Sequence, residues 1–202
     1  MTLYCEAADP QGHAVRIVLA EKDVNVEVHF VDAQTRPDDL NDLNPYGQIL
    51  TLIDRDLVIY EPQIMMEYLD ERYPHPPLMP VDPAARANNR QIRYRIARDL
   101  FGLLGAIGGR SETAANNARR ALRDNLTAIA PVFAQHPYFL SAEMSLIDCF
   151  LAPLLWRLNL YGIKLPPTQA RAMLRYAEAM FARPGFRVSL SAMEQELRIG
   201  KL

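Results

Sequence analysis

The sequence predicts an α/β domain with a small mixed sheet, followed by an all-helical domain. Short apolar runs alternate with helical runs up to residue 74, whereas helix follows helix from residue 83 onward. Between the two halves lies a segment with four prolines in seven residues, Pro74–Pro80. Proline fixes φ and removes a backbone donor, so this segment forms neither a helix nor a central strand. We therefore expect domains at 1–74 and 83–202, joined by a rigid linker at 75–82.

The first domain is expected to contain four strands and three helices. Alternating apolar residues predict strands, and apolar residues three or four apart predict helices. The expected elements are a strand at 2–6, a helix at 13–22, a strand at 25–31, a helix at 37–43, strands at 49–53 and 57–60, and a helix at 62–72. The helical crossover makes the first two strands parallel, and the short turn at 54–56 makes the last two antiparallel. This order is typical of the thioredoxin-like arrangement.

The first helix has one apolar face and one charged face in this prediction. Val15, Val18 and Leu19 are spaced to face the core. Arg16, Glu21 and Lys22 are expected to lie toward water.

The second domain is expected to be built from five helices. They span 83–107, 112–134, 146–160, 168–183 and 189–199, and Pro131 should bend or end the second. Tyr94 and Phe101 lie away from the apolar stripe of the first of these helices, where they would form either a second packing contact or a dimer contact. Ser145 and Asp148 form the signature of an N-terminal capping box for the central helix.

Composition and charge exclude several classes of function. The net charge is -2, which argues against a dominant phosphate-binding face and against direct, sequence-specific nucleic-acid binding. No apolar run is long enough to cross a bilayer, and no signal-peptide pattern is visible. Cys5 and Cys149 lack metal or redox spacing, and the four histidines are scattered. We expect a cytoplasmic protein with buried thiols, no metal and no cofactor.

The two-domain order, with Asn44-Pro45-Tyr46-Gly47 in the first half and Ser145-Leu146-Ile147-Asp148 in the second, resembles the glutathione transferase fold. Within that fold, the segments 15–22, 66–80 and 151–158 are similar to bacterial stringent starvation protein A, and the resemblance spans essentially the whole chain. This family implies a dimeric, non-enzymatic regulator in the stress response. It implies association with RNA polymerase holoenzyme including its sigma factor.

The resemblance also implies a partner-binding surface at the proline segment. Prolines give this segment a backbone that loses little entropy on binding, and the imidazole of His75 can donate or accept a hydrogen bond. The candidate contact residues are Arg72, Tyr73, Pro74, His75, Pro76, Pro77, Leu78, Met79 and Pro80.

Three positions that glutathione transferases use are altered here. The stretch Asp9-Pro10-Gln11-Gly12-His13 stands at the position of the catalytic serine or cysteine, with Gly12 in its place, and the negative charge of Asp9 would raise the pKa of a thiol there. Leu50 replaces the cis-proline before the third strand, and a cis bond there would cost roughly 2.5–4 kcal/mol. Pro62 replaces the serine of an acid–serine pair and offers neither a hydroxyl nor an amide donor. We therefore expect no glutathione transferase activity.

Two alternatives remain open from the sequence. Tyr4 lies near the end of the first strand, where tyrosine-type transferases have their catalytic hydroxyl, and Cys5 follows it. A strand cysteine without a basic neighbour has no reason to ionise, which argues against Cys5 as a nucleophile. The other alternative is a glutathione-fold protein that binds a small ligand.

Overall fold

The computed structural model describes residues 1–32, 34–38 and 40–197. Contacts divide the chain into two units, Met1–Pro77 with the described part of Pro184–Leu202, and Leu78–Arg183. The boundaries expected from the sequence differ, because they assign everything after residue 83 to the helical domain. The last segment groups with the first unit since α9 (Pro184–Ser189) packs against α1 (Pro10–Glu21).

The first unit contains the predicted four-stranded mixed sheet, in the order β2-β1-β3-β4. Strand β1 (Thr2–Cys5) pairs in parallel with β2 (Glu27–Phe30) and antiparallel with β3 (Thr51–Asp54). Strand β4 (Leu57–Ile59) pairs antiparallel with β3 across a two-residue turn. Both predicted strand directions are confirmed.

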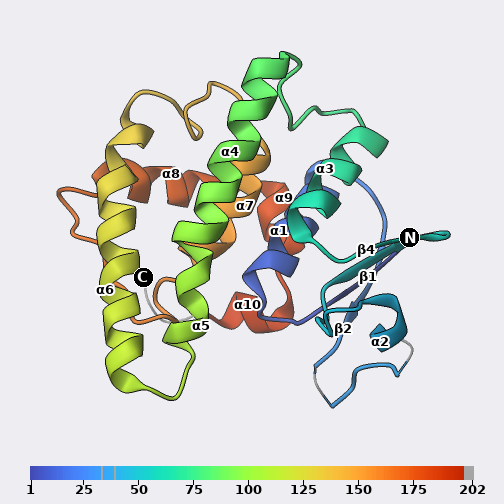
Figure 1. Cartoon of the computed structure of the whole chain (residues 1–202). Helices are drawn as coiled ribbons and strands as arrows, with labels where there is room; N and C mark the ends of the chain where they lie inside the picture. The colour runs from blue at the N-terminus through green and yellow to red at the C-terminus, as the bar shows by residue number, and fades with distance from the viewer. Residues whose placement is uncertain (33, 39, 198–202) are drawn as a thin grey trace. The chain divides into compact units, whose positions relative to one another are not determined.

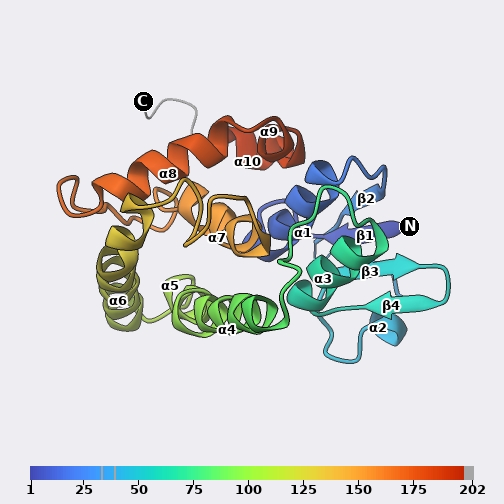
Figure 2. The ribbon, with the colours of Figure 1, turned by 90° about the horizontal axis from the view of Figure 1, so that it is seen from above.

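Helices of the first unit pack around α1, which lies between α9 and α3 (Pro62–Arg72) in Figure 2. Helix α1 begins three residues earlier than expected, because the Asp9 carboxylate caps it by accepting from the amides of Gln11 and Gly12. The short helices α2 (Leu40–Leu43) and α10 (Ala192–Glu196) complete the unit.

The prediction that Arg16 and Lys22 face water is wrong. Both are buried, each in an ion pair with a carboxylate distant in sequence. The Arg16 guanidinium contacts both carboxylate oxygens of Glu194 on α10, at 3.0 and 2.8 Å. The Lys22 ammonium lies 2.5 Å from the Asp70 carboxylate on α3. The first helix is therefore buried on more sides than its apolar stripe indicated.

The second unit is entirely helical, as predicted. Its α-helices, labelled in Figure 1, are α4 (Pro83–Asp99), α5 (Leu104–Ile107), α6 (Glu112–Ile129), α7 (Leu146–Trp156) and α8 (Arg171–Ala182), and two short 3-10 helices, η1 (Phe101–Leu103) and η2 (Ala130–Ala134), lie among them. The expected long first helix is broken after α4. Phe101, which follows the break, is buried and stacks on Phe150 of α7 with ring centroids 4.6 Å apart. Tyr94 is 58% exposed on α4.

The capping box of α7 also forms hydrogen bonds with residues of the second unit that lie outside α7. The Asp148 carboxylate accepts from the Ser145 amide at 2.8 Å, and the Ser145 hydroxyl accepts from the Ile147 amide. Asp148 also accepts from the Phe139 amide at 2.9 Å and from the Tyr176 hydroxyl at 2.8 Å. One buried carboxylate thus joins α7, α8 and the loop before α7.

In the described part of the chain, no helix has the length and apolar character needed to span a membrane.

Candidate functional site

The first unit's part of the proline segment lies at the surface. Arg72 ends α3, and Pro74, His75, Pro76 and Pro77 follow in an exposed stretch without helix or strand. The His75–Pro76 peptide bond is cis. Three exposed prolines restrict the backbone conformation of this stretch, and the imidazole of His75 can either donate or accept a hydrogen bond.

The end of the segment belongs to the second unit and is buried. Leu78 is 4% exposed and Met79 is 5% exposed, while Pro80 is half-buried. The Leu78 carbonyl accepts from the Leu146 amide at the start of α7. The side chains of Leu78 and Met79 therefore secure the segment, and the accessible surface runs from Arg72 to Pro77.

The side chains at the C-terminal end of α3 are held by Asp54 of β3. The Tyr68 hydroxyl donates to the Asp54 carboxylate at 2.5 Å, and Arg72 Nε lies 3.8 Å from the same group. The Arg72 guanidinium also lies over the ring of Tyr73, 5.8 Å from its centroid. The hydrogen bond to Asp54 raises the pKa of Tyr68. These contacts fix Arg72 and Tyr73 beside the prolines.

The position of the transferase nucleophile has no room for a hydroxyl or a thiol. A Cβ at Gly12 would lie 2.9 Å from the Cys5 Cβ and 3.1 Å from the Asp9 carboxylate. Carbon atoms that are not bonded rarely approach this closely, so a serine or cysteine would require movement of the strand or the helix. The same Cβ would lie 3.6 Å from the Leu50 side chain, so Leu50 also packs against this position.

The two other glutathione positions lack the required donors and geometry. The only cis bond among the described residues is the one before Pro76, so the peptide before Leu50 is trans. Pro62 is the first residue of α3, and the Glu61 side chain makes no capping hydrogen bond. A helix N-terminus binds an anion through its free amides, and Pro62 removes one of them.

Cys5 is unsuited to nucleophilic chemistry. Burial raises the pKa of its thiol to about 12; Arg16 opposes this shift, and the carboxylates of Asp9 and Glu194 add to it. Tyr4, the other candidate, is half-buried and stacks on His29 with ring centroids 5.0 Å apart. Its position agrees with a packing role.

Cys5 is therefore expected to resist alkylation in the folded protein. At pH 8 the Cys5 thiol is almost entirely protonated, since the pH lies about four units below its pKa of about 12. Mass spectrometry after iodoacetamide treatment should show Cys5 unmodified under native conditions and modified in denaturant. Rapid native alkylation of Cys5, located by peptide mapping, would contradict the buried geometry.

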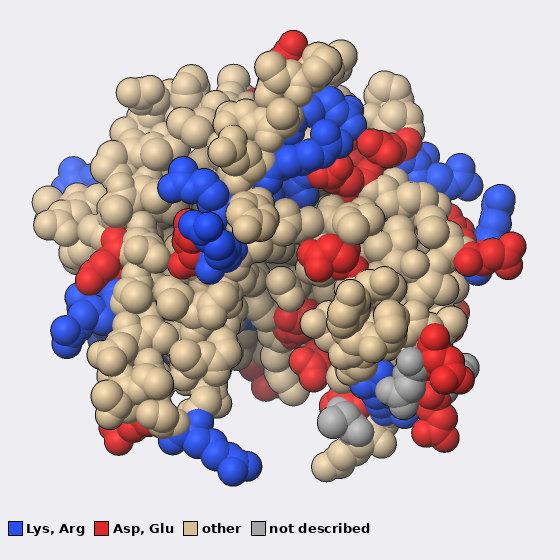
Figure 3. All heavy atoms as spheres, in the orientation of Figure 1, with Lys and Arg blue, Asp and Glu red and all other residues tan. Residues whose placement is uncertain are grey.

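The two units have opposite charge. The first unit contains seventeen Asp and Glu residues and eight Lys and Arg residues, whereas Leu78–Arg183 contains seven and fourteen. Acidic side chains gather over the first unit on the face that Figure 3 shows. The surface from Arg72 to Pro77 thus belongs to an acidic unit, which disfavours a nucleic-acid backbone as its partner.

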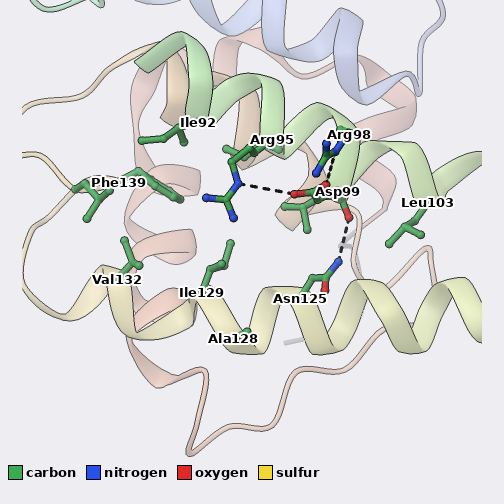
Figure 4. A pocket seen from close by; sticks show the side chains of 13 residues that line it. Ile92, Arg95, Arg98, Asp99, Leu103, Asn125, Ala128, Ile129, Val132 and Phe139 are labelled. Atoms are coloured by element: carbon green, nitrogen blue, oxygen red, sulfur yellow. Dashed lines mark hydrogen bonds and ion pairs between the residues drawn. The ribbon is translucent and has the colours of Figure 1, made fainter. Parts of the chain in front are cut away.

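A pocket of about 680 Å³ lies in the second unit between α4 and α6. Its lining includes the apolar side chains of Ile96, Ile129 and Val132. Figure 4 shows Arg95 and Arg98 directed at Asp99, whose backbone carbonyl accepts from Asn125. Within the described residues, no group of His, Cys, Asp and Glu is arranged to hold a metal ion.

The buried pair of Lys22 and Asp70 was not predicted from the sequence, although their spacing contained a signal. Lys22 follows Val15 and Val18 at intervals that continue the apolar stripe of α1. Asp70 follows Met66 by four residues on α3. A charged residue on an apolar stripe indicates a buried partner, and here the two charges are each other's partner.

The thioredoxin-like sheet followed by a helical unit defines a protein of the glutathione transferase fold class. Residues 1–71 match the family model "Glutathione S-transferase, N-terminal domain", and residues 94–186 match "Glutathione S-transferase, C-terminal domain". A solved structure of BphK, a bacterial GST, superposes with a TM-score of 0.86 at 22% identity, covering 96% of this chain and 100% of that one.

The chain belongs to the stringent starvation protein A family. It is 46% identical to a stringent starvation protein A homolog of Coxiella burnetii over 198 residues, which cover 98% of this chain and 95% of the relative. It is also 46% identical to the homolog of Pasteurella multocida over 190 residues, which cover 94% of this chain and 90% of that relative.

Proposed function

We propose that this protein is a cytoplasmic transcription regulator that binds RNA polymerase holoenzyme, including its sigma factor, by protein contact and without glutathione chemistry. Membership in the stringent starvation protein A family supports this proposal. The single observation that supports the mechanism best is the exposed segment from Pro74 to Pro77 on a unit whose glutathione positions are blocked.

The segment has the properties of a protein-contact surface. Its prolines have few accessible backbone conformations, so binding costs little conformational entropy. Arg72 and Tyr73 flank it, and arginine and tyrosine are among the residues that contribute most at interfaces. The surrounding acidic unit favours a partner surface with basic side chains.

Co-migration with polymerase tests this function. The purified chain is mixed with holoenzyme at physiological salt and separated by size exclusion. The proposal predicts elution of the chain with the polymerase. Separate elution across a range of concentrations up to tens of micromolar would contradict it.

Glutathione is expected to leave no binding signal. Gly12, Leu50 and Pro62 together remove the space, the cis geometry and the amide that the ligand needs. Isothermal titration should give only heats of dilution, with a glutathione transferase as the positive control. Saturable binding, or thiol conjugation that disappears in Tyr4→Phe, would instead support the transferase alternative.

We also propose that the protein forms a homodimer, with the region Pro83–Ile107 at its interface. The exposed ring of Tyr94 on α4 supports this choice, since an exposed aromatic side chain on a helix is a common interface residue. Light scattering should give about twice the chain mass of 22.9 kDa. Tyr94→Asp should lower the measured mass toward that of the monomer, and an unchanged mass would remove Tyr94 from the interface.

The pocket in the second unit favours a second candidate function, the binding of a small ligand. Its volume of about 680 Å³ is within the usual range for ligand sites, and both arginines and apolar side chains line it. An amphipathic carboxylate would suit these groups. A fluorescent fatty acid that binds the wild type and is displaced by the unlabelled fatty acid, but does not bind Ile129→Trp, would support this candidate.

A further inference from the structure

The ammonium group of Lys22 joins two parts of the first unit. Lys22 caps the C-terminal end of α1, and its side chain is fully buried. Its Nζ lies 2.5 Å from the Asp70 carboxylate on α3, and it also donates to the carbonyl of Pro76 in the proline segment. Asp70 is also largely buried. One buried charge therefore contacts both the helix before the exposed segment and the segment itself.

The segment depends on such a donor because of its composition. Pro74, Pro76 and Pro77 have no amide hydrogen, so their backbones can form hydrogen bonds only as acceptors, through the carbonyl oxygens. A carbonyl that accepts from a charged group forms a stronger bond than one that accepts from a neutral group. The Lys22 contact thus fixes the backbone between His75 and Pro77.

Asp70 makes this arrangement possible. An isolated ammonium group is costly to bury. The carboxylate compensates the charge and sets the position of Nζ. Without Asp70, the ammonium would have no reason to remain beneath the segment.

We infer that Lys22 is a positioning residue for the contact surface, held in place by Asp70, and that it keeps His75 and Pro77 oriented toward the partner. This inference rests on the proposed function for the partner itself. The positioning of His75, however, is a property of the free protein and can be measured without polymerase.

A double variant separates positioning from stability. Lys22→Met alone leaves the Asp70 carboxylate buried without its ammonium partner, so the protein should lose stability. Lys22→Met/Asp70→Asn removes both charges and should recover much of that stability, but it lacks the Lys22 ammonium that donates to the Pro76 carbonyl. The double variant should therefore fold, as circular dichroism can verify, and bind holoenzyme about tenfold more weakly than wild type.

The pair formed by Arg16 and Glu194 provides a matched control. It is also a buried ion pair of α1, but its partners lie on α10 and at the end of α9. Arg16→Met/Glu194→Gln should lower the thermal midpoint and leave the polymerase affinity unchanged at temperatures where the variant is folded. An equal loss of affinity in this control would assign the effect to general destabilisation.

The NMR signal of the His75 ring gives the direct readout. The signal is assigned by its absence in His75→Gln, and signals of His29 and His136 serve as internal references. We expect the His75 signal to shift or divide in Lys22→Met/Asp70→Asn and to remain unchanged in the control. An unmoved signal would overturn the inference, and so would a moved signal with undiminished affinity. If wild type itself fails to bind holoenzyme, the proposed function fails, while the NMR comparison still decides whether Lys22 positions the segment.

Discussion

Replacing His75 and Pro77 together by alanine is expected to weaken the affinity for RNA polymerase holoenzyme about 100-fold. Both side chains are exposed, and central interface residues each cost about 2 kcal/mol or more on truncation. Two such losses with partial overlap amount to roughly 2.7 kcal/mol, which is a factor of about 100. Surface plasmon resonance with immobilised holoenzyme measures this difference.

The same variant should keep its stability, because exposed substitutions usually change the free energy of unfolding by less than about 0.5 kcal/mol. Val188→Ala is the matched control, since Val188 is an exposed apolar residue on α9 of the same unit. The control should bind as wild type does. Wild-type affinity in the folded double variant would show that the proline segment is not the contact surface.

Replacing Asp148 by alanine is expected to lower the free energy of unfolding by about 3–5 kcal/mol. The carboxylate accepts from the amides of Phe139 and Ser145 and from the Tyr176 hydroxyl, all in a buried setting. Each buried donor left without a partner costs about 1–3 kcal/mol, and partial relaxation reduces the sum. Urea unfolding followed by circular dichroism measures the loss. A loss below about 1 kcal/mol would contradict the role of Asp148 in joining α7 and α8.

Asp148→Asn is the matched variant, because it keeps one acceptor oxygen and removes the charge. Burial raises the pKa of Asp148, although its hydrogen bonds oppose the shift. A raised pKa in the folded state means that the folded protein binds this proton more tightly than the unfolded chain. The wild-type stability should therefore fall, relative to the asparagine variant, as the pH rises from the unfolded pKa through the folded pKa. The opposite trend would show that the hydrogen bonds outweigh burial.

The positions of the strands along the chain and the directions of the first and last strand pairs could be predicted because they depend on local signals. Alternation defines each strand, the crossover helix makes the first pair parallel, and the turn at Arg55 makes the last pair antiparallel. The capping signature of Ser145 and Asp148 is local in the same way. The further hydrogen bonds of Asp148 with Phe139 and Tyr176 depend on packing, and the sequence near Asp148 does not predict them.

The buried charges could not be paired from the sequence, because their partners are remote. Glu194 lies 178 residues after Arg16, and Asp70 lies 48 residues after Lys22. Lys22 was predicted to face water although its spacing continues the apolar stripe of α1, and its partner appears only when α1 and α3 pack together. The candidate surface shows the same limit: composition predicts a rigid segment at Pro74–Pro77, the family resemblance implies its role as a contact surface, and the burial of Leu78 and Met79 depends on packing in the second unit.

Titration of the amine-labelled protein with RNA polymerase holoenzyme, with and without millimolar glutathione, tests the central claim most directly. Fluorescence anisotropy reports polymerase binding, and the comparison shows whether glutathione competes for the protein. We expect a saturable rise in anisotropy that is the same in both conditions. An anisotropy that does not rise with holoenzyme would contradict the proposal of a contact regulator. A rise that glutathione abolishes would contradict the claim that the glutathione site has been lost.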